Sequence, residues 1–192
     1  MGSTSQDDYE VKVKGAISKL IRDFRGYPDI FLTEEDTRCR LYTYLLEDFN
    51  QIEKSRHNVL SIPLHTEVRW YGNKEKLKLR SDIVIIDALS LDTNKKYVLS
   101  KGYSFADAIA VIELKLRRVK YSPNNSEFRK IIEDDMEKLR KIRDNVNIMS
   151  GLYLLVFDKR DNMGISNTNN GGIHQFYVFG GRYDSNNSVI KI

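Results

Sequence analysis

Apolar side chains recur at intervals of three or four residues in two segments near the N-terminus, and this spacing predicts two helices. The first helix, over about 8–25, has an apolar face made of Val13, Ile17, Leu20, Ile21 and Phe24. The RGYPD segment that follows contains a Gly and a Pro, which break helices. The second helix is expected to begin near Glu34, because Thr33 is a suitable N-cap and Asp36 follows three residues later.

The pattern then changes to the period of β-strands. HTEVRWYG alternates in polarity, and RSDIVIID and AIAVIELKL are short runs rich in β-branched and apolar residues. Together these segments predict three strands in succession. The segment between the second and third strands, at 88–107, contains Asn-Lys-Lys and Lys-Gly, which predict a loop or an extra hairpin.

The rest of the chain returns to a helix and two strands. Apolar residues at helical spacing from Phe128 to Val146, after a Ser or Asn cap, predict a helix. GLYLLVFD predicts a buried strand, and HQFYVFGG predicts a last strand at about 174–181. The order helix, three strands, helix, strand predicts an α/β protein whose mixed sheet is covered by helices on both faces.

Composition narrows the class of protein. The 192 residues are 41% hydrophobic and 30% charged, a globular balance within the size of one domain. The longest apolar runs are too short to cross a membrane and the N-terminus has no apolar signal segment, so a soluble, cytoplasmic protein is expected. The single cysteine, Cys39, excludes an internal disulfide and a cysteine-rich zinc site. A formal net charge of +4 gives weak support for a polyanionic partner.

Two charges interrupt the third predicted strand where it would otherwise be buried. Because side chains alternate along a strand, Glu113 and Lys115 project on one side and Leu114 on the other. Asp82 begins the apolar part of the preceding strand, and pairing of the two strands would bring it beside Glu113. A buried carboxylate is costly unless it is paired, and a cation is one suitable partner. The carboxylates of Asp82 and Glu113, with the backbone carbonyl of Leu114, suit Mg²⁺ or Mn²⁺.

Three roles are open to Lys115 beside such a metal ion. It would orient an attacking water, help to deprotonate that water, or stabilise the charge that develops in a phosphoryl transition state. The metal ion would polarise the phosphate and lower the pKa of bound water. These parts predict metal-dependent hydrolysis of phosphodiester bonds. The alternative is a salt-bridged surface pair of Glu113 and Lys115, with Asp82 as a turn residue.

At these positions the chain resembles the PD-(D/E)xK nuclease superfamily, which has the restriction-endonuclease-like fold. Asp82, Glu113 and Lys115 match the Asp…Glu-x-Lys signature, and Ser81 stands where the superfamily has Pro. By the order of elements the resemblance spans roughly 33–158, although the motif itself covers only a few positions.

The resemblance implies one nuclease-like domain over 1–192. Its α-β-β-β-α-β core would occupy about 33–158, with the helix at about 8–25 before it and the strand at about 174–181 after it. It also implies an Mg²⁺- or Mn²⁺-dependent nuclease that acts on DNA, with RNA left open as a substrate and a homodimer left open as the assembly. A nucleic-acid-binding or scaffold protein that kept the fold without catalysis is the alternative.

Members of the superfamily often carry one more acid on the helix before the first strand. Glu34 or Glu35 would supply it here, and the TEED context favours Glu34. Acids in the first turn of a helix are also stabilised by the helix dipole alone, so a purely structural role for Glu34 stays open.

Basic residues continue directly from the proposed site in the RRVK segment. Arg117, Arg118 and Lys120 are the predicted contacts to nucleic-acid phosphates. The KLRKIR segment of the following helix, at 138–143, has acidic neighbours and is treated as an uncertain contact. Candidates for stacking on bases are Trp70 and the tyrosines, including Tyr71, Tyr103 and Tyr121, although core packing explains most of them more simply.

Overall fold

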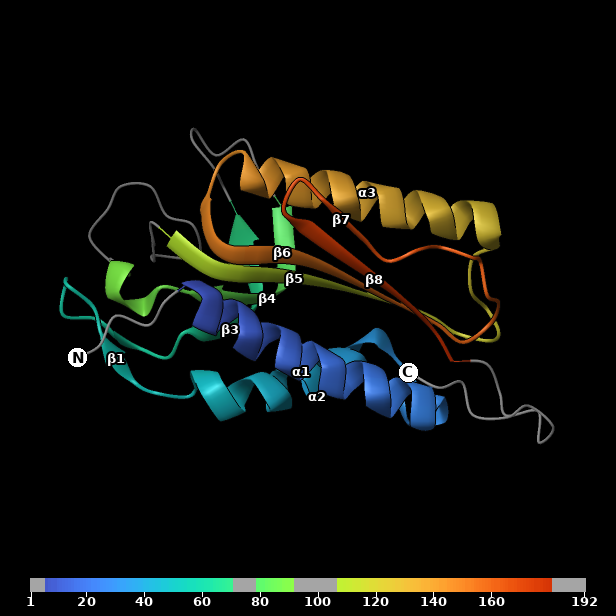
Figure 1. Cartoon of the computed structure of the whole chain (residues 1–192), viewed down its shortest axis with the longest axis horizontal. Coiled ribbons are helices and arrows are strands. Elements are labelled where there is room, and N and C mark those ends of the chain that lie inside the picture. Colours follow the sequence, from blue (N-terminus) through green and yellow to red (C-terminus); the bar gives the residue numbers. More distant parts are fainter. Residues whose placement is uncertain (1–5, 71–78, 92–106, 181–192) are drawn as a thin grey trace.

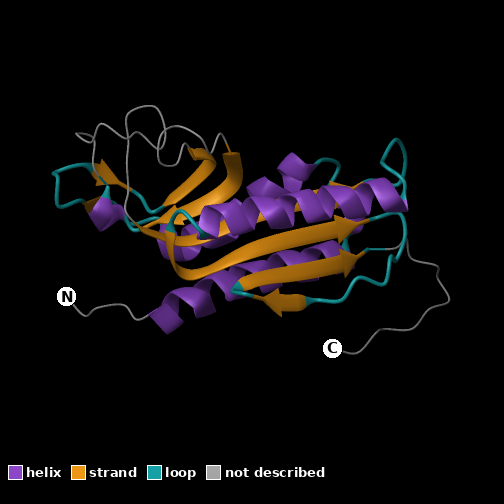
Figure 2. Ribbon diagram, turned by 90° about the horizontal axis from the view of Figure 1, so that it is seen from above, coloured by secondary structure: helices purple, strands orange, loops and turns teal. Residues whose placement is uncertain are grey.

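The computed structural model describes residues 6–70, 79–91 and 107–180 (Figure 1). Within these ranges the protein is a mixed α/β structure in which a six-stranded sheet lies between helices. Helices α1 (Gln6–Gly26) and α2 (Glu34–Phe49) cover one face of the sheet, and α3 (Asn125–Arg143) covers the other (Figures 1 and 2). The prediction of a sheet covered on both faces is confirmed. In the described ranges, none of the helices is both long enough and apolar enough to cross a membrane.

Local sequence signals account for the ends of the helices. The short 3-10 helix η1 (Pro28–Ile30) separates α1 from α2, as the RGYPD segment predicted. At the start of α2, the Thr33 side chain accepts a hydrogen bond from the Asp36 N–H, and the Asp36 carboxylate accepts one from the Thr33 N–H at 2.8 Å. The same reciprocal cap is formed by the residues that begin α3. Both helices therefore start at positions that short-range hydrogen bonds fix.

The sheet is mixed because its two halves pair differently. Its strands, in spatial order, are β3 (Leu64–Trp70), β4 (Leu79–Ile86), β5 (Asp107–Arg117), β6 (Asn147–Asp158), β8 (Ile173–Phe179) and β7 (Thr168–Asn170). The first three pair antiparallel, whereas β5, β6 and β8 pair in parallel and β7 returns antiparallel to β8. Strand β5 is thus the junction between the antiparallel and the parallel half.

The expected order of the core elements is also confirmed, since α2, β3, β4, β5, α3 and β6 follow one another along the chain. The short strands β1 (Glu53–Lys54), β2 (Leu60–Ser61) and β7 were not predicted, because two or three residues are too few to show a period. The predicted loop at 88–107 begins with a 3-10 helix, η3 (Ala88–Ser90), and its part at 92–106 lies outside the described residues.

Strand β5 is buried on both faces over most of its length. Ile112 and Leu114 point into the core beneath α1 and α2, and Val111 points into the core beneath α3. A strand covered on both faces reads as a continuous apolar run, which is why AIAVI shows no alternation. Glu113 is the first charged residue after this run, and the charged side chains of β5 that follow it gather near the end of the strand.

Candidate active site

Pairing of β4 with β5 brings the first two candidate residues together. The antiparallel register places Ile83 opposite Ile112, so Asp82 and Glu113 occupy the next opposed positions. The Asp82 carboxylate accepts a hydrogen bond from the Leu114 N–H at 2.8 Å. The predicted pairing of the two strands is therefore confirmed, and Asp82, Glu113 and Leu114 share one short stretch of the sheet.

Glu34 reaches the same stretch from the first turn of α2. Its carboxylate accepts hydrogen bonds from the Lys115 ammonium group and from the Leu116 N–H, both at 3.2 Å. The cap of α2 is made by Asp36 and its partner, so Glu34 is not needed for that purpose. Glu35 instead forms an ion pair with an arginine of its own helix. Of the two acids considered from the sequence, Glu34 is the one that contacts Lys115.

Lys115 is held as a cation between carboxylates from two helices. Its Nζ atom lies 3.2 Å from the Glu34 carboxylate and 3.3 Å from the carboxylate of Asp135 in α3. Burial alone would lower the pKa of Lys115, but Asp135 and Glu34 outweigh it and raise that pKa above its ordinary value. A lysine that keeps its proton donates hydrogen bonds and stabilises negative charge, but it cannot accept a proton from water. The arrangement therefore favours two of the three roles considered for Lys115.

Glu113 carries a carboxylate into the core, where its relative exposure is 1%. Burial raises the pKa of Glu113 to about 8; Lys138 opposes this shift, and the neighbouring carboxylates of Asp82 and Asp135 add to it. Its Oε2 atom accepts a hydrogen bond from Lys138 at 2.6 Å. Its Oε1 atom is buried and has no hydrogen-bond partner among the described residues. One carboxylate oxygen of Glu113 is thus open to a further positive partner.

Asp135 and Lys138 of α3 complete this group. Neither was predicted to belong to the site, and Lys138 was considered only as part of the 138–143 segment. The Lys138 Nζ atom lies 3.1 Å from Asp135 as well as 2.6 Å from Glu113. Both residues flank the buried stripe of α3 that contains Met136 and Leu139. That position is the signal in the sequence that points to them. It is weak, because charged residues border the apolar stripe of most amphipathic helices.

On the opposite side of the site, Arg38 of α2 links acids from two strands. Its guanidinium group lies 3.6 Å from the Asp82 carboxylate and also forms an ion pair with Glu67 of β3. Glu67 is paired in addition with Arg80. Positive side chains therefore accompany Asp82 as well as Glu113.

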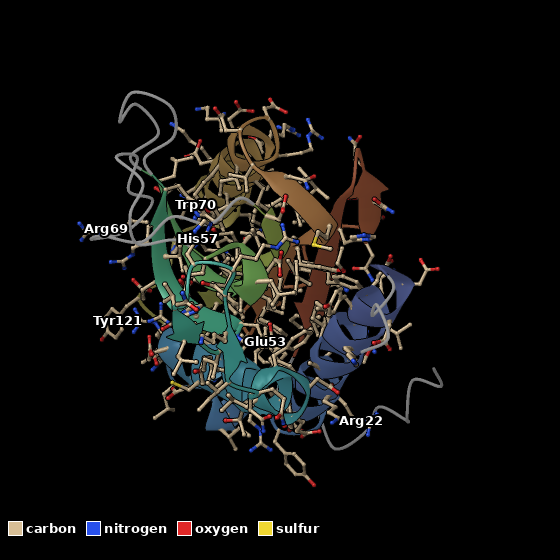
Figure 3. All side chains as sticks on the ribbon, turned by 90° about the vertical axis from the view of Figure 1, so that its left-hand side faces the viewer. Arg22, Glu53, His57, Arg69, Trp70 and Tyr121 are labelled. Atoms are coloured by element: carbon tan, nitrogen blue, oxygen red, sulfur yellow. The ribbon has the colours of Figure 1, made fainter. Side chains whose placement is uncertain are left out.

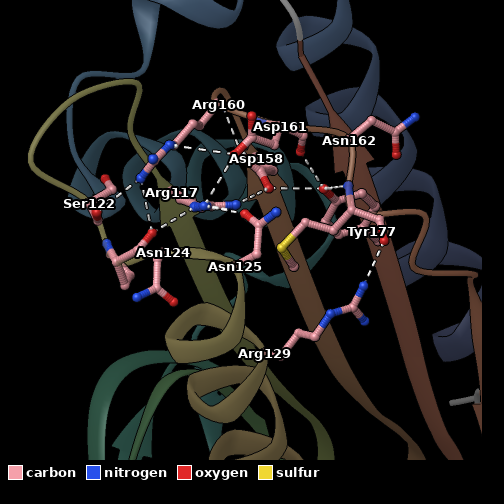
Figure 4. A network of polar contacts seen from close by, with 12 residues as sticks. Arg117, Ser122, Asn124, Asn125, Arg129, Asp158, Arg160, Asp161, Asn162 and Tyr177 are labelled. Carbon is pink, nitrogen blue, oxygen red and sulfur yellow. Dashed lines mark hydrogen bonds and ion pairs between the residues drawn. The ribbon is translucent and has the colours of Figure 1, made fainter.

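The sequence predicted that Arg117 contacts nucleic acid, and this prediction is wrong. Its side chain is buried and is surrounded by polar groups of the protein (Figure 4). Its side chain is 0% exposed and pairs at 3.2 Å with Asp158, which is also fully buried. It donates further hydrogen bonds to Asn125 at 2.6 Å and to the Pro123 carbonyl at 3.1 Å. Tyr177 donates a hydrogen bond to the same Asp158 carboxylate. Because a buried carboxylate requires such a partner, Arg117 serves the core and is not available to a phosphate.

The other two predicted contacts have the opposite environment. Arg118 and Lys120 are exposed and lie in the loop between β5 and α3. Tyr121 in the same loop is 97% exposed and lies at the outside of the molecule (Figure 3). Trp70, by contrast, is buried and donates a hydrogen bond to Ser81 at 2.9 Å, so core packing accounts for it.

One feature of this group of residues suits a divalent cation, namely the unpaired carboxylate oxygen of Glu113. Over the described ranges, no set of three or more His, Cys, Asp or Glu side chains is arranged to hold a metal ion. The ligands expected from the sequence include only two carboxylates, those of Asp82 and Glu113, and Mg²⁺ is commonly bound through one or two carboxylates and several waters. The buried, unpaired Oε1 atom of Glu113 is the type of atom that a cation stabilises.

Comparisons of the chain with protein-family models, with curated proteins and with solved structures found no match. The functional interpretation therefore depends on the residues and contacts described above.

The raised pKa of Glu113 predicts that stability falls as the pH rises. Between about pH 4.5 and pH 8 the folded protein keeps a proton on Glu113 that the unfolded chain has lost, so the folded state binds more protons. In metal-free buffer, the free energy of unfolding of the wild type should fall by on the order of 3 kcal/mol more than that of Glu113→Gln across this window. Urea unfolding at the two pH values measures the difference. Glu133→Gln, at an exposed position of α3, is the control and should behave as the wild type does.

The buried ion pair of Arg117 predicts a large loss of stability in Arg117→Met. This change keeps an apolar stem but leaves the Asp158 carboxylate buried without its cation, which should cost about 3–5 kcal/mol in denaturant unfolding. Arg118→Met removes the same charge from the exposed neighbouring position and should change stability by roughly 0.5 kcal/mol or less. Equal stability of the two variants would contradict the structural role of Arg117.

Proposed function

We propose that this protein is a metal-dependent nuclease of the PD-(D/E)xK type that hydrolyses phosphodiester bonds of DNA. The observation that carries the proposal is the opposed placement of Asp82 and Glu113 on paired strands, with Lys115 two residues further along β5. Two separate strands thereby bring three ionic side chains to one site: Asp82 from β4, and Glu113 and Lys115 from β5. The order of elements from α2 to β6 agrees with the restriction-endonuclease-like fold and supports the proposal.

The residues of the site divide into metal ligands and positioning groups. Asp82, Glu113 and the Leu114 carbonyl would hold Mg²⁺ or Mn²⁺. The bound ion would supply a water of lowered pKa and would polarise the phosphate. Glu34 positions Lys115 through the 3.2 Å hydrogen bond between them.

Lys115 then acts as a protonated donor. Its ammonium group would orient the attacking water or stabilise the negative charge on the phosphate oxygens in the transition state. Removal of a water proton would fall to another group, such as a phosphate oxygen of the substrate, because Lys115 is held as a cation by Glu34 and Asp135.

The substrate surface would continue into the loop that follows β5. Arg118, Lys120 and Tyr121 are exposed there, and the loop begins three residues after Lys115. Positive side chains bind phosphates and an exposed aromatic ring can stack on a base. A nucleic acid is therefore the ligand that this surface fits.

One observation favours the alternative of a nucleic-acid-binding protein without catalysis. Lys115 is paired with Glu34 and Asp135, and Lys138 is paired with Glu113, so the charges of the site largely neutralise one another. An inactive member of the fold would keep such pairs for stability alone.

Cleavage assays distinguish the two functions. Linear duplex, single-stranded and branched DNA are incubated with the wild type, Asp82→Ala or Lys115→Ala in Mg²⁺ or Mn²⁺. Each substitution should lower the rate by about 100-fold or more. Arg22→Ala, at an exposed position of α1, should retain the wild-type rate. Unchanged cleavage in both site variants would refute the assignment of the site, and DNA binding without any cleavage by the wild type would favour the inactive protein.

The loop residues predict a salt-dependent contribution to DNA binding. The double variant Arg118→Ala/Lys120→Ala should bind DNA more weakly. The slope of the logarithm of the binding constant against the logarithm of the salt concentration is negative, and its magnitude should fall by about 2, one unit for each phosphate that the variant no longer neutralises. Fluorescence anisotropy in Ca²⁺, at several salt concentrations, measures both quantities. Arg22→Ala/Arg25→Ala removes the same charge from exposed positions of α1 and should leave the slope unchanged.

A further inference from the structure

Lys138 stands at the point where a cation is needed. Its Nζ atom lies 2.6 Å from the Oε2 atom of Glu113 and 3.1 Å from the Oδ1 atom of Asp135. The Lys138 side chain is 19% exposed and that of Glu113 is 1% exposed, so the ion pair between them is largely removed from water. A buried carboxylate in such surroundings is stable only with a positive partner.

The two lysines of the site have different partners. Lys115 contacts Glu34 and one oxygen of Asp135, whereas Lys138 contacts Glu113 and the other oxygen of Asp135. Asp135 is thus shared by both ammonium groups. The expected metal ligand Glu113 is therefore paired with Lys138 and not with Lys115, the lysine of the Glu-x-Lys motif.

We propose that Lys138 is an internal cation that takes the place of the metal ion at Glu113 and gives way when the metal binds. This inference rests on the proposed function, since it assumes that Glu113 is a metal ligand. A divalent ion on Glu113 would repel the Lys138 ammonium group at Oε2, because two positive charges on the same carboxylate group lie close together in a partly buried site. Asp135, already 3.1 Å away, offers Lys138 a carboxylate to which it can move without leaving the site.

This exchange would couple metal binding to the packing of α3. Without metal, Lys138 ties α3 to β5 through Glu113; with metal, Lys138 remains on its own helix with Asp135. The tethered ammonium group would lower the apparent affinity for the metal ion, because binding must displace it. When Glu113 is ionised, the ammonium group would also stabilise the metal-free protein, because it neutralises that carboxylate while the ion is absent.

Metal titrations of the full chain test this competition. Mn²⁺ binding is measured by calorimetry and by the rise in melting temperature for the wild type, Lys138→Met, Lys138→Gln and Lys138→Arg, at one pH and one ionic strength. Lys138→Met should melt several degrees below the wild type without metal. Both neutral variants should bind Mn²⁺ about tenfold or more tightly than the wild type, and Lys138→Arg, which keeps the charge, should not.

Two controls separate the possible failures. Lys141→Met, on the exposed side of the same helix, should leave both the melting temperature and the Mn²⁺ affinity unchanged. Asp82→Asn should abolish Mn²⁺ binding. If Asp82→Asn abolishes binding but the neutral Lys138 variants bind as the wild type does, the role of Lys138 is refuted and the metal site stands. If Mn²⁺ binds neither the wild type nor any variant, both proposals are refuted. Lys138→Gln keeps a hydrogen-bond donor toward Glu113, so it provides the test if Lys138→Met does not fold.

Discussion

Glu113 carries a carboxylate into a mostly apolar interior, and the structure around it supplies positive charge. The cost of removing an ionised carboxylate from water is several kcal/mol, so the surrounding elements cannot be arranged arbitrarily. Helix α3 must present Lys138 to β5, because Lys138 is the positive partner of Glu113. The burial of one carboxylate thus constrains how α3 packs against β5, whereas the register of β4 brings a second acid, Asp82, to the same place.

Helices from both faces of the sheet meet at the end of β5 for the same reason. Glu34 of α2 and Asp135 of α3 both contact Lys115, while Lys138 joins Asp135 to Glu113. Acidic and basic groups therefore alternate through the site. Such an arrangement orients fixed charges before any substrate arrives, which is the condition for electrostatic stabilisation of a transition state. The same ion pairs stabilise the folded protein, so its stability and the proposed catalysis depend on the same contacts.

A second buried ion pair, between Arg117 of β5 and Asp158 of β6, joins the ends of these two strands next to the site. Arg117 follows Lys115 by two residues, yet it is buried with Asp158 and holds the start of α3 through Asn125. Hydrogen bonds from Arg117 to the Pro123 carbonyl and from Arg160 to the Ser122 carbonyl hold the loop between β5 and α3 (Figure 4). Arg118 and Tyr121 are exposed in this loop. Adjacent arginines in one basic segment thus have different roles: one supports the loop from inside, and the other belongs to the outer surface.

Much of the fold could be predicted from the sequence because its signals are local. Helical spacing identified α1, α2 and α3, alternating polarity identified β3, and apolar runs identified the other four longer strands. The capping residues located the start of α2. The motif also identified Asp82, Glu113 and Lys115, because their strands are neighbours both in the chain and in the sheet. Strands of two or three residues gave no such signal and were missed.

Only the tertiary structure decided which charged residues belong to the interior. In the sequence, Asp135 and Lys138 resemble the other charges of α3, and Arg117 resembles Arg118. The roles of Asp135 and Lys138 depend on how α3 is rotated against β5. The role of Arg117 depends on the partners that β6 and β8 bring to the end of β5, namely Asp158 and Tyr177. The sequence by itself determined the elements and the motif, because periodicity, capping and strand order are short-range properties. The partner of each charge was decided by packing, because burial and ion pairing depend on residues that are distant in the chain.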